Sequence, residues 1–515
     1  MEPINKLILL VLGGALLLGA VACLPKSFPQ IIPTATVIET ITATRSLPAA
    51  TFTKTLTATQ TPTVTSTPVP ASSPIFGVEM DQITVGGGLD EVAAASTTWV
   101  RWNAVLWSSI ESTKGTYTWS AMADLETELK NASSNGMQVV LIVRSTPEWA
   151  RKIAGTGSSC GPIIEGELPT FGNFMNALVV RYSVAPYNVK YWELWNEPDI
   201  DSASFTGDNI FGCWGDPSDA YYGGGYYAEM LKVVYPQIKA ADPQAQVVVG
   251  GLLLDCDPRP GAGCDTIGHS NLPPKFLEGI LRDNGLNDGG NYFDGVSFHA
   301  YDFYDYVNYS GSFGQYGNGA WQSTWDSTGP VAIAKTEFIK SVLSSYSVSG
   351  KFLMNTEVAL GCGDANGSQS YCKTADFETT KAYYLAQTYA AGIAEGLRAS
   401  IWYSVLGWRN SGLLNTDLSP RPAYTAFQFA RNELGDAVYI GEITAADIGG
   451  ASSVKGYKFQ WGDRRIWVLW SLDGNTYSIN LSSVPLGAWD ALGNSISPTI
   501  SMNVSLNPLY LEWNP

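Results

Sequence analysis

The chain has 515 residues, enough for more than one domain at a typical length of about 100–200 residues per domain. Hydrophobic residues make up 45% of it and charged residues 15%, which predicts a folded chain with a sizeable core. The net charge of −17 argues against nucleic acid as a partner, because phosphate binding needs a basic surface that releases counterions. The 17 Trp and 26 Tyr suit ligands such as sugars, whose C–H faces stack on aromatic rings.

The N-terminus has the pattern of a targeting segment. An apolar run over residues 7–21 follows Lys6 and is too short for a comfortable membrane span. The run ends in Ala-Val-Ala directly before Cys23, which resembles a bacterial lipobox. We therefore expect residues 1–22 to be a lipoprotein signal peptide and Cys23 to carry a lipid that anchors the exported protein at the bacterial cell surface. A simple signal peptide and an uncleaved anchor are the alternatives.

A low-complexity segment follows. From about residue 31 to residue 74 the sequence consists of Thr, Pro, Ser and Ala with almost no large apolar side chains. Such a segment buries too little surface to offset the entropy lost on ordering. Residues 23–74 are therefore predicted to be the lipidated cysteine and a disordered stalk that holds the folded part off the membrane.

Six cysteines remain when Cys23 is set aside. An even number of cysteines in an exported chain predicts disulfides, with buried free thiols as the alternative. Two close pairs would clip short loops, although the sequence leaves the connectivity open. The cysteines fall in chain order as Cys160 and Cys213, Cys256 and Cys264, and Cys362 and Cys372.

Short apolar runs alternate with helix-period stretches over residues 75–435. Continuously apolar strands that alternate with helices indicate a parallel sheet covered on its faces. Eight such units predict an α/β fold, a (β/α)₈ TIM barrel with enlarged loops. A doubly wound open sheet is the alternative, but no Gly-rich phosphate turn follows any strand. The expected strands are 76–80, 98–102, 139–143, 189–194, 246–250, 295–299, 352–355 and 399–403.

The texture changes after residue 435. Short strands expected over 457–461, 465–470 and 476–481 are separated by Gly, Asp and Asn turns. Residues 436–515 are therefore predicted to form a small antiparallel β-sandwich domain that packs on the barrel, since about 80 residues are few for independent stability.

Two glutamates carry the clearest chemical signal. Asn196 and Glu197 follow the fourth expected strand in the sequence Trp-Glu-Leu-Trp-Asn-Glu-Pro, and Glu357 follows the seventh in Leu-Met-Asn-Thr-Glu. The carboxyl ends of barrel strands form the face where barrel enzymes place catalysis. Strands four and seven lie on opposite sides of the barrel mouth, so the two carboxyl groups could face each other across a sugar. A retaining glycosidase needs such a pair about 5–5.5 Å apart.

Asn-Glu-Pro at strand four together with Glu at strand seven resembles glycoside hydrolase clan A, the retaining barrel glycosidases. The trailing β-domain is similar to that of family thirty-nine. The resemblance implies a retaining O-glycosyl hydrolase acting on a plant-type or microbial poly- or oligosaccharide, with Glu197 as acid/base and Glu357 as nucleophile. It implies no cofactor and no metal.

The resemblance also assigns substrate-binding residues. Arg101 would hold the nucleophile ionised, Asn196 would bind the sugar 2-OH, and Tyr301 would donate to Glu357 or to the ring oxygen. The remaining expected substrate contacts are His299, beside Tyr301 at strand six, and three tryptophans: Trp402 as the floor under the cleaved sugar, Trp408 as its competitor for that place, and Trp149 after strand three.

Each of these positions also has a purely structural interpretation. Strand-end polar residues can be solvated loop residues, Arg101 can be an ordinary ion-pair partner, and His299 can be a structural histidine. Two other functions share the framework: a non-catalytic surface lipoprotein that binds carbohydrate, and a transglycosylase. Retention of both glutamates with Asn196 and Arg101 favours an enzyme over a binding protein.

Overall fold

The computed structural model describes residues 74–153, 159–201, 211–257, 274–304, 314–315, 321–323, 325, 329–363 and 368–514. The predicted signal peptide, Cys23, the predicted stalk and Cys264 lie outside these residues.

Eight parallel strands close into a barrel, as predicted. The sheet runs in the order β5-β4-β3-β2-β1-β10-β9-β6, and a further pairing of β5 with β6 closes the ring. All eight expected strands are present, which confirms the barrel over the open sheet. The short strands β7 (Gly314–Gln315) and β8 (Trp321–Ser323) extend the sheet antiparallel beyond β6. The barrel strands are β1 (Phe76–Glu79), β2 (Trp99–Leu106), β3 (Gln138–Arg144), β4 (Tyr191–Asn196), β5 (Gln246–Leu252), β6 (Gly295–Tyr304), β9 (Phe352–Gly361) and β10 (Ala399–Trp402).

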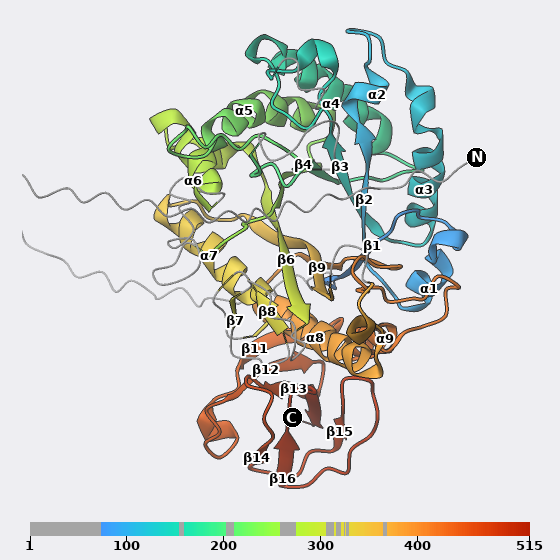
Figure 1. Cartoon of the computed structure of the whole chain (residues 1–515), viewed down its shortest axis with the longest axis vertical. Helices are drawn as coiled ribbons and strands as arrows, with labels where there is room; N and C mark the ends of the chain where they lie inside the picture. The colour runs from blue at the N-terminus through green and yellow to red at the C-terminus, as the bar shows by residue number, and fades with distance from the viewer. Residues whose placement is uncertain are drawn as a thin grey trace, which may run out of the picture. The chain divides into compact units, whose positions relative to one another are not determined.

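Helices surround the strands (Figure 1). Their buried positions recur at helical spacing; in α3, for example, Leu125, Leu129 and Ala132 are buried on one face. α9 begins at Pro422, where the missing N–H of proline costs nothing because the first turn leaves it unpaired. The helices are α1 (Leu89–Ala94), α2 (Trp107–Ile110), α3 (Ala123–Ser134), α4 (Leu168–Tyr182), α5 (Gly224–Ala241), α6 (Pro274–Arg282), α7 (Val331–Ser345), α8 (Ala375–Ala394) and α9 (Pro422–Leu434).

Side chains alternate between two buried layers along the strands. The inward-facing set forms a small apolar plug that includes Trp99, Ala399 and Ile401. The outward-facing set, which includes Val100 and Trp402, joins the large core beneath the helices. Alternation of this kind follows from the two-residue period of a strand, and it decides which residues can reach the barrel mouth.

The C-terminal strands form two antiparallel layers. A sheet in the order β11-β12-β13-β17-β15 faces the two-stranded ribbon β14-β16 across a second apolar core that includes Leu469, Ile479 and Leu511. This agrees with the predicted antiparallel β-domain. The strands are β11 (Val438–Glu442), β12 (Val454–Trp461), β13 (Arg464–Ser471), β14 (Tyr477–Asn480), β15 (Gly487–Trp489), β16 (Ser501–Val504) and β17 (Leu509–Trp513).

The other face of the larger sheet packs on the barrel helices. Phe429 of α9 lies edge-on to Tyr510 of β17, with ring centroids 5.0 Å apart. Gln387 of α8 donates a 2.8 Å hydrogen bond to the carbonyl of Leu506. The strands are therefore buried against α8 and α9, which agrees with the expectation that this small domain packs on the barrel.

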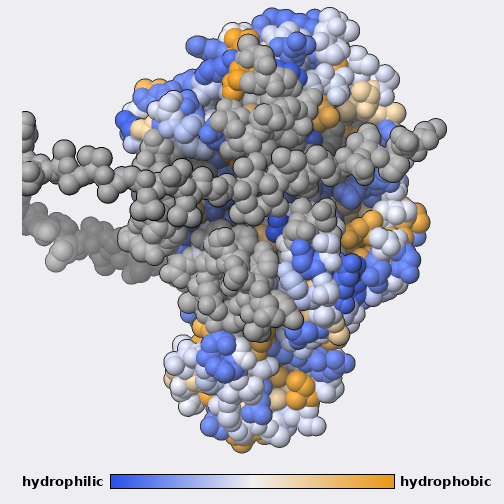
Figure 2. All heavy atoms as spheres, in the orientation of Figure 1, coloured by the Kyte–Doolittle hydropathy of each residue, from blue (hydrophilic) through white to orange (hydrophobic). Residues whose placement is uncertain are grey.

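Two disulfides lie within the described residues, Cys160–Cys213 and Cys362–Cys372. Both fit an exported chain, because disulfides persist in oxidising compartments. The predicted pairing of Cys256 with Cys264 involves a residue outside those described. None of the described helices is both long and apolar enough to cross a membrane. On the face drawn in Figure 2, hydrophilic residues prevail and hydrophobic ones form scattered spots.

Candidate active site

Arg101 is the centre of the polar site. It lies near the end of the expected strand 98–102, but β2 continues to Leu106, so Arg101 projects from within the strand. Its side chain is fully buried, and its guanidinium donates from Nη1 to Oε1 of Glu357 at 2.5 Å and from Nε to Oε2 of Glu193 at 2.7 Å. Charge-assisted bonds of this kind fix both carboxyl groups in position.

The other terminal nitrogen of Arg101 faces Asn196 and His299. Nη2 donates to Oδ1 of Asn196 at 2.7 Å and lies 3.3 Å from Nε2 of His299. An arginine has only donors, so Nε2 of His299 is the acceptor, and the imidazole proton sits on Nδ1. One buried cation thus orients residues from β4, β6 and β9.

Nδ1 of His299 lies 2.7 Å from Oε1 of Glu197 and 3.4 Å from Oε2 of Glu357. Burial, together with the charges of Arg101 and Lys335, holds the pKa of His299 well below its ordinary value of 6.5. The ring is therefore neutral and donates its single N–H to Glu197.

Glu197 is presented by unusual backbone. It directly follows β4 and has a φ of 49°, and Trp195 two residues earlier has a φ of 69°. Both lie in the left-handed region, which costs non-glycine residues about 1–3 kcal/mol each and persists only where neighbours enforce it. The amide of Glu197 donates to the carbonyl of Gly251 at 2.9 Å, which ties this turn to the end of β5.

A β-bulge brings Glu357 beside His299. The pairing of β6 with β9 aligns Phe298 with Asn355 but His299 with Glu357, so Thr356 is the extra residue. Glu357 lies within β9 rather than at its end, because that strand runs on to Gly361. Bulges redirect side chains and are common next to active sites.

The two carboxyl groups are close and differ in surroundings. One donor atom each from Glu197, His299 and Glu357 lies within 4.8 Å of the others. Burial, with the charge of Glu357 added, raises the pKa of Glu197 well above its ordinary value. Burial also raises the pKa of Glu357, but hydrogen bonds from Arg101 and Tyr301 oppose the rise, so Glu357 ionises first.

The same three donors have the spacing of a metal site, and the chemistry around them argues against one. Arg101 already donates to Glu357 and to His299, so a divalent cation would meet a permanent positive charge at contact distance. The geometry instead suits two carboxyl groups with one imidazole between them, of which Glu357 is bound directly to Arg101 and Glu197 through His299.

Aromatic rings stand beside Glu357. The hydroxyl of Tyr301 donates to Oε2 of Glu357. The ring of Tyr301 lies edge-on to Trp408 at 5.5 Å and to Tyr403 at 6.0 Å between centroids. Tyr301 and Trp408 are thus brought to the site as expected from the sequence.

Trp402 is not at the site, which corrects the sequence interpretation. Its side chain is fully buried, its ring packs 6.2 Å from that of Tyr384 in α8, and its Nε1 donates to the carbonyl of Ser411. The reason is strand alternation: Ala399 and Ile401 face inward, so Trp402 faces the helices and Tyr403 returns to the barrel mouth.

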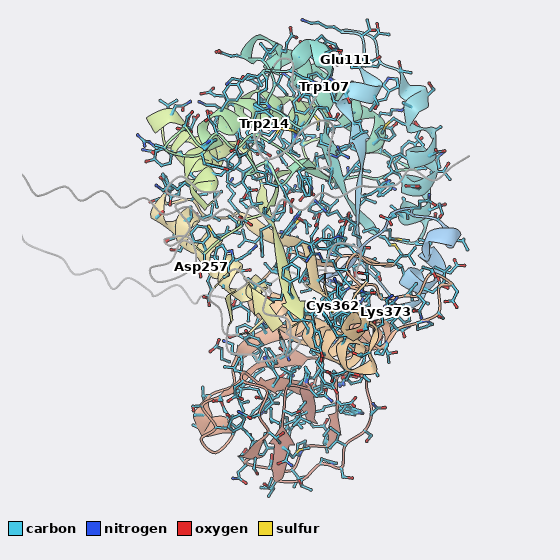
Figure 3. All side chains as sticks on the ribbon, viewed as in Figure 1. Trp107, Glu111, Trp214, Asp257, Cys362 and Lys373 are labelled. Carbon is cyan, nitrogen blue, oxygen red and sulfur yellow. A yellow bond between two sulfur atoms is a disulfide. The ribbon has the colours of Figure 1, made fainter. Side chains whose placement is uncertain are left out.

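Trp149 is placed among the loops after β2 and β3. Its ring lies edge-on to Trp107 at 5.4 Å, and its Nε1 donates to the carbonyl of Glu111 at 3.0 Å. Trp107 and Glu111 lie together near α2 in Figure 3, where Nε1 of Trp107 donates to Oε2 of Glu111 at 2.7 Å. These contacts show Trp149 packing with the loops, and none of them connects it to the glutamate pair.

Sequence reasoning missed two carboxyl groups of the site. Glu79 ends β1 and accepts from Nη1 of Arg101 at 2.7 Å. Glu193 lies inside β4 and accepts from Ser297 and Thr356 as well as from Arg101. A charged residue inside an apolar strand, or at a strand's carboxyl end, was the available signal.

A second buried cation lies on the Glu197 side of the site. Lys335 of α7 donates from Nζ to the carbonyls of Leu253 and His299, at 2.7 and 2.8 Å. Asp199 accepts from the amides of Leu253 and Leu254 at 2.8 and 2.9 Å. Burial raises the pKa of Asp199 to about 6 and lowers that of Lys335 to about 8. Asp199 thus fastens the turn after Glu197 to the residues that follow β5, and Lys335 ties Leu253 to His299 within β6.

Barrel and site together define a glycoside hydrolase of clan A, the retaining glycosidases. The model of one family matches residues 67–392, and its description is cellulase, glycosyl hydrolase family 5. Because this match spans more than half of the sequence, the chain belongs to glycosyl hydrolase family 5. A search of curated proteins finds no significant match.

Solved structures share the fold. A family 39 glycoside hydrolase from the gut symbiont Bacteroides cellulosilyticus aligns with a TM-score of 0.59 at 19% identity, over 86% of this chain and 81% of that one. A family 30 endoxylanase from Clostridium papyrosolvens gives 0.53 at 11% identity, over 86% and 98%. A family 39 β-xylosidase from Caulobacter crescentus gives 0.51 at 15%, also over 86% and 98%. At these identities the similarity is one of fold.

Proposed function

We propose that the protein hydrolyses O-glycosidic bonds by double displacement, with Glu357 as nucleophile and Glu197 as acid/base. The observation that carries the proposal is the placement of one neutral imidazole between the two carboxyl groups. His299 donates to Glu197 at 2.7 Å and lies 3.4 Å from Glu357. Carboxyl oxygens within 4.8 Å of each other suit a retaining pair better than an inverting one, which needs room for water between them.

The protonation states follow from the contacts. Arg101 and Tyr301 both donate to Glu357, so this carboxyl group is the anion at rest. Glu197 keeps its proton because burial and the charge of Glu357 both oppose its ionisation. Oε1 of Glu197 accepts from His299, so the proton is on Oε2, from which it is passed to the leaving oxygen.

The reaction has two balanced steps. A carboxylate oxygen of Glu357 attacks the anomeric carbon while the bond to the leaving oxygen breaks and that oxygen takes the proton of Glu197. Formation of the ester removes the negative charge of Glu357, and the pKa of Glu197 falls. Glu197 then accepts a proton from water, the hydroxide oxygen attacks the anomeric carbon, and Glu357 is released with the configuration retained.

Neighbouring groups fit supporting roles. Asn196, whose Oδ1 accepts from Arg101, lies beside Glu197 and carries an amide of the kind that binds a sugar 2-OH. Tyr301, Tyr403 and Trp408 supply aromatic surface next to Glu357, which suits the C–H face of a sugar.

For the substrate we propose a β-linked plant-type or microbial polysaccharide or its oligosaccharides. The matching family is described as cellulase, and two proteins of similar fold are described as an endoxylanase and a β-xylosidase. A panel of aryl glycosides, β-glucans and xylans tests this choice. Activity confined to α-linked substrates would refute it.

The mechanism is tested by chemical rescue. Glu357→Ala is expected to be inactive on every substrate and to regain turnover with azide, giving the glycosyl azide of inverted configuration. Glu197→Ala is expected to keep activity on substrates with acidic leaving groups and to give the retained azide. Proton NMR of the first sugar released by the wild type decides between mechanisms: an inverted product would exclude Glu357 as nucleophile.

We also propose that the exported protein is held at the bacterial cell surface by a lipid on Cys23. The proposal rests on the lipobox-like residues before Cys23 and on the disulfides of the folded part. Metabolic labelling with a palmitate analogue should mark the wild type and leave Cys23→Ser unmarked. Equal labelling of the two would refute the anchor.

A further inference from the structure

Glu79 is the third carboxyl group on the cation that holds the nucleophile. Nη1 of Arg101 carries two hydrogens, and it donates to Oε2 of Glu79 at 2.7 Å and to Oε1 of Glu357 at 2.5 Å. Glu79 and Glu357 therefore sit on either side of a single nitrogen, one at the end of β1 and the other within β9.

The two side chains are equally accessible. Glu79 and Glu357 each expose 10% of their side chain, whereas Arg101 and Glu193 expose none. Oε2 of Glu79 is taken by Arg101; among the described residues no hydrogen bond reaches its Oε1. Glu79 thus presents an oxygen to solvent in the same neighbourhood as the nucleophile, while Glu193 serves only the interior.

The neighbours of Glu79 are those expected around the reacting sugar. Burial raises the pKa of Tyr403, and the nearby carboxyl groups of Glu79 and then Glu357 add to the rise. The backbone carbonyl of Glu79 accepts from the amide of Val405 at 3.0 Å, so β1 is tied to the loop that follows Tyr403. Glu79, Tyr403 and Glu357 therefore surround one small region.

Glu79 is a neutral acid at neutral pH. Burial raises its pKa to about 8, and the charges of Glu357 and Glu193 add to the rise that Arg101 opposes. A protonated carboxyl group has an O–H to donate, unlike the acceptor-only carboxylate of Glu357.

We propose that Glu79 is a substrate-binding residue of the reacting subsite, whose free oxygen donates a hydrogen bond to a hydroxyl of the sugar ring attacked by Glu357. The inference rests on the proposed function and adds a residue that selects the sugar. A sugar with that hydroxyl in the opposite configuration leaves the donor unpaired in a buried site, which is the kind of mismatch that discriminates strongly between substrates.

The test is a comparison of variants and monodeoxy substrates. We would measure kcat/KM for the wild type, Glu79→Ala and Glu79→Gln on the 2,4-dinitrophenyl glycoside of the preferred sugar and on its monodeoxy analogues. This leaving group needs no proton from Glu197, so the comparison is free of the acid/base step. Glu442→Gln, a substitution on exposed β11, is the matched control and should leave kcat/KM unchanged.

Glu79→Ala should lose roughly 30–100-fold on the full substrate, as expected for removal of a hydrogen bond to substrate in a buried site. For one monodeoxy analogue, the kcat/KM of the wild type should be lower than for the full substrate by a similar factor. For Glu79→Ala, kcat/KM should be almost the same on that analogue as on the full substrate. Glu79→Gln should recover at least about tenfold over Glu79→Ala, because the amide keeps the shape, an acceptor and an N–H donor.

Losses that multiply for every monodeoxy analogue would overturn the proposal, because Glu79 would then act only by supporting Arg101. A kcat/KM for Glu79→Gln that is no higher than that of Glu79→Ala would also overturn it. The proposed mechanism is judged separately, from the configuration of the product released by the wild type, so its failure and a failure at Glu79 give different results.

Discussion

The imidazole of His299 donates from Nδ1 to Oε1 of Glu197 across 2.7 Å, while Nε2 of the same ring accepts from Arg101 at 3.3 Å. The ring thus links the position of the buried guanidinium to that of Glu197, the proposed acid/base. It does so without competing for the catalytic proton, because its own pKa is held far below 6.5.

His299→Ala should therefore change the pH profile as well as the rate. An N–H donor stabilises the ionised form of Glu197, so its removal raises the pKa of Glu197 further. On a phenyl glycoside, which needs the proton of Glu197, the alkaline limb of kcat/KM should move to higher pH, and kcat should fall roughly 10–100-fold. His299→Gln, which keeps an N–H donor, is the control. An alkaline limb that stays in place would contradict this role.

Arg101→Met should destabilise the fold. It leaves the fully buried Glu193, together with Glu79 and Glu357, without their cation, and breaking a buried ion pair costs about 3–5 kcal/mol. Urea unfolding followed by tryptophan fluorescence measures the change. Arg181→Met removes a pair with Glu126 on the surface, where the arginine is 40% exposed, and should cost less than about 1 kcal/mol. Equal losses in the two variants would mean that Arg101 is not the organising cation.

Substitutions of Tyr403 and of Trp402 should have different effects on kcat/KM and on stability. Tyr403→Ala removes a ring beside Tyr301 and Trp408 and should lower kcat/KM by about tenfold or more, with a smaller effect on stability. Trp402→Phe removes a buried hydrogen bond to Ser411 and should lower the free energy of unfolding by about 1–2 kcal/mol. Its kcat/KM should stay within about threefold of the wild type. The opposite pattern would restore Trp402 as the floor of the sugar site.

Removal of each of the two disulfides should have a different effect on stability and on kcat. Replacing both cysteines of Cys160–Cys213 by serine should cost roughly 4 kcal/mol, and replacing those of Cys362–Cys372 roughly 3, since the loops they close span 53 and 10 residues. The first bond also supports the turn that carries Glu197, because the carbonyl of Cys160 accepts from Nε1 of Trp195 at 2.9 Å. Its loss should lower kcat as well. Thermal unfolding and kcat would be measured side by side for the two double variants. Equal kcat values would contradict this link.

The barrel was predictable because its signal is repeated. Eight apolar runs separated by helical stretches allow few arrangements, and each strand supplies the same evidence again. The pairing of Glu197 with Glu357 follows from that arrangement, because strand ordinals decide which loop ends meet across the barrel.

The directions of individual side chains were harder to predict because they depend on strand register. Trp402 and Tyr403 are adjacent, and a shift of one residue exchanges inside for outside. Counting from Ala399 and Ile401 in steps of two would have selected Tyr403. The bulge that aligns His299 with Glu357 has no comparable signal, because it depends on the pairing of two strands far apart in the sequence.

Glu79 and Glu193 were missed for a different reason. The strand-end criterion that found Glu197 applies equally to Glu79, which ends β1. Glu193 reads as a single charged residue within an apolar strand, and only the barrel interior shows that Arg101 is its partner. Contacts between side chains on strands far apart in the sequence can be identified only when the closed barrel is known.

The arrangement around Arg101 has a consequence for how this chain can evolve. Its acceptors come from β1, β4 and β9, so replacement of any one of them removes a hydrogen bond that positions the guanidinium for the other two. Substitutions at Glu79, Glu193 and Glu357 should therefore be strongly epistatic, with fitness costs that depend on the order in which they arise. Lineages that change the sugar they bind should keep Arg101 and Glu193 fixed and vary Glu79 together with the loop after Tyr403.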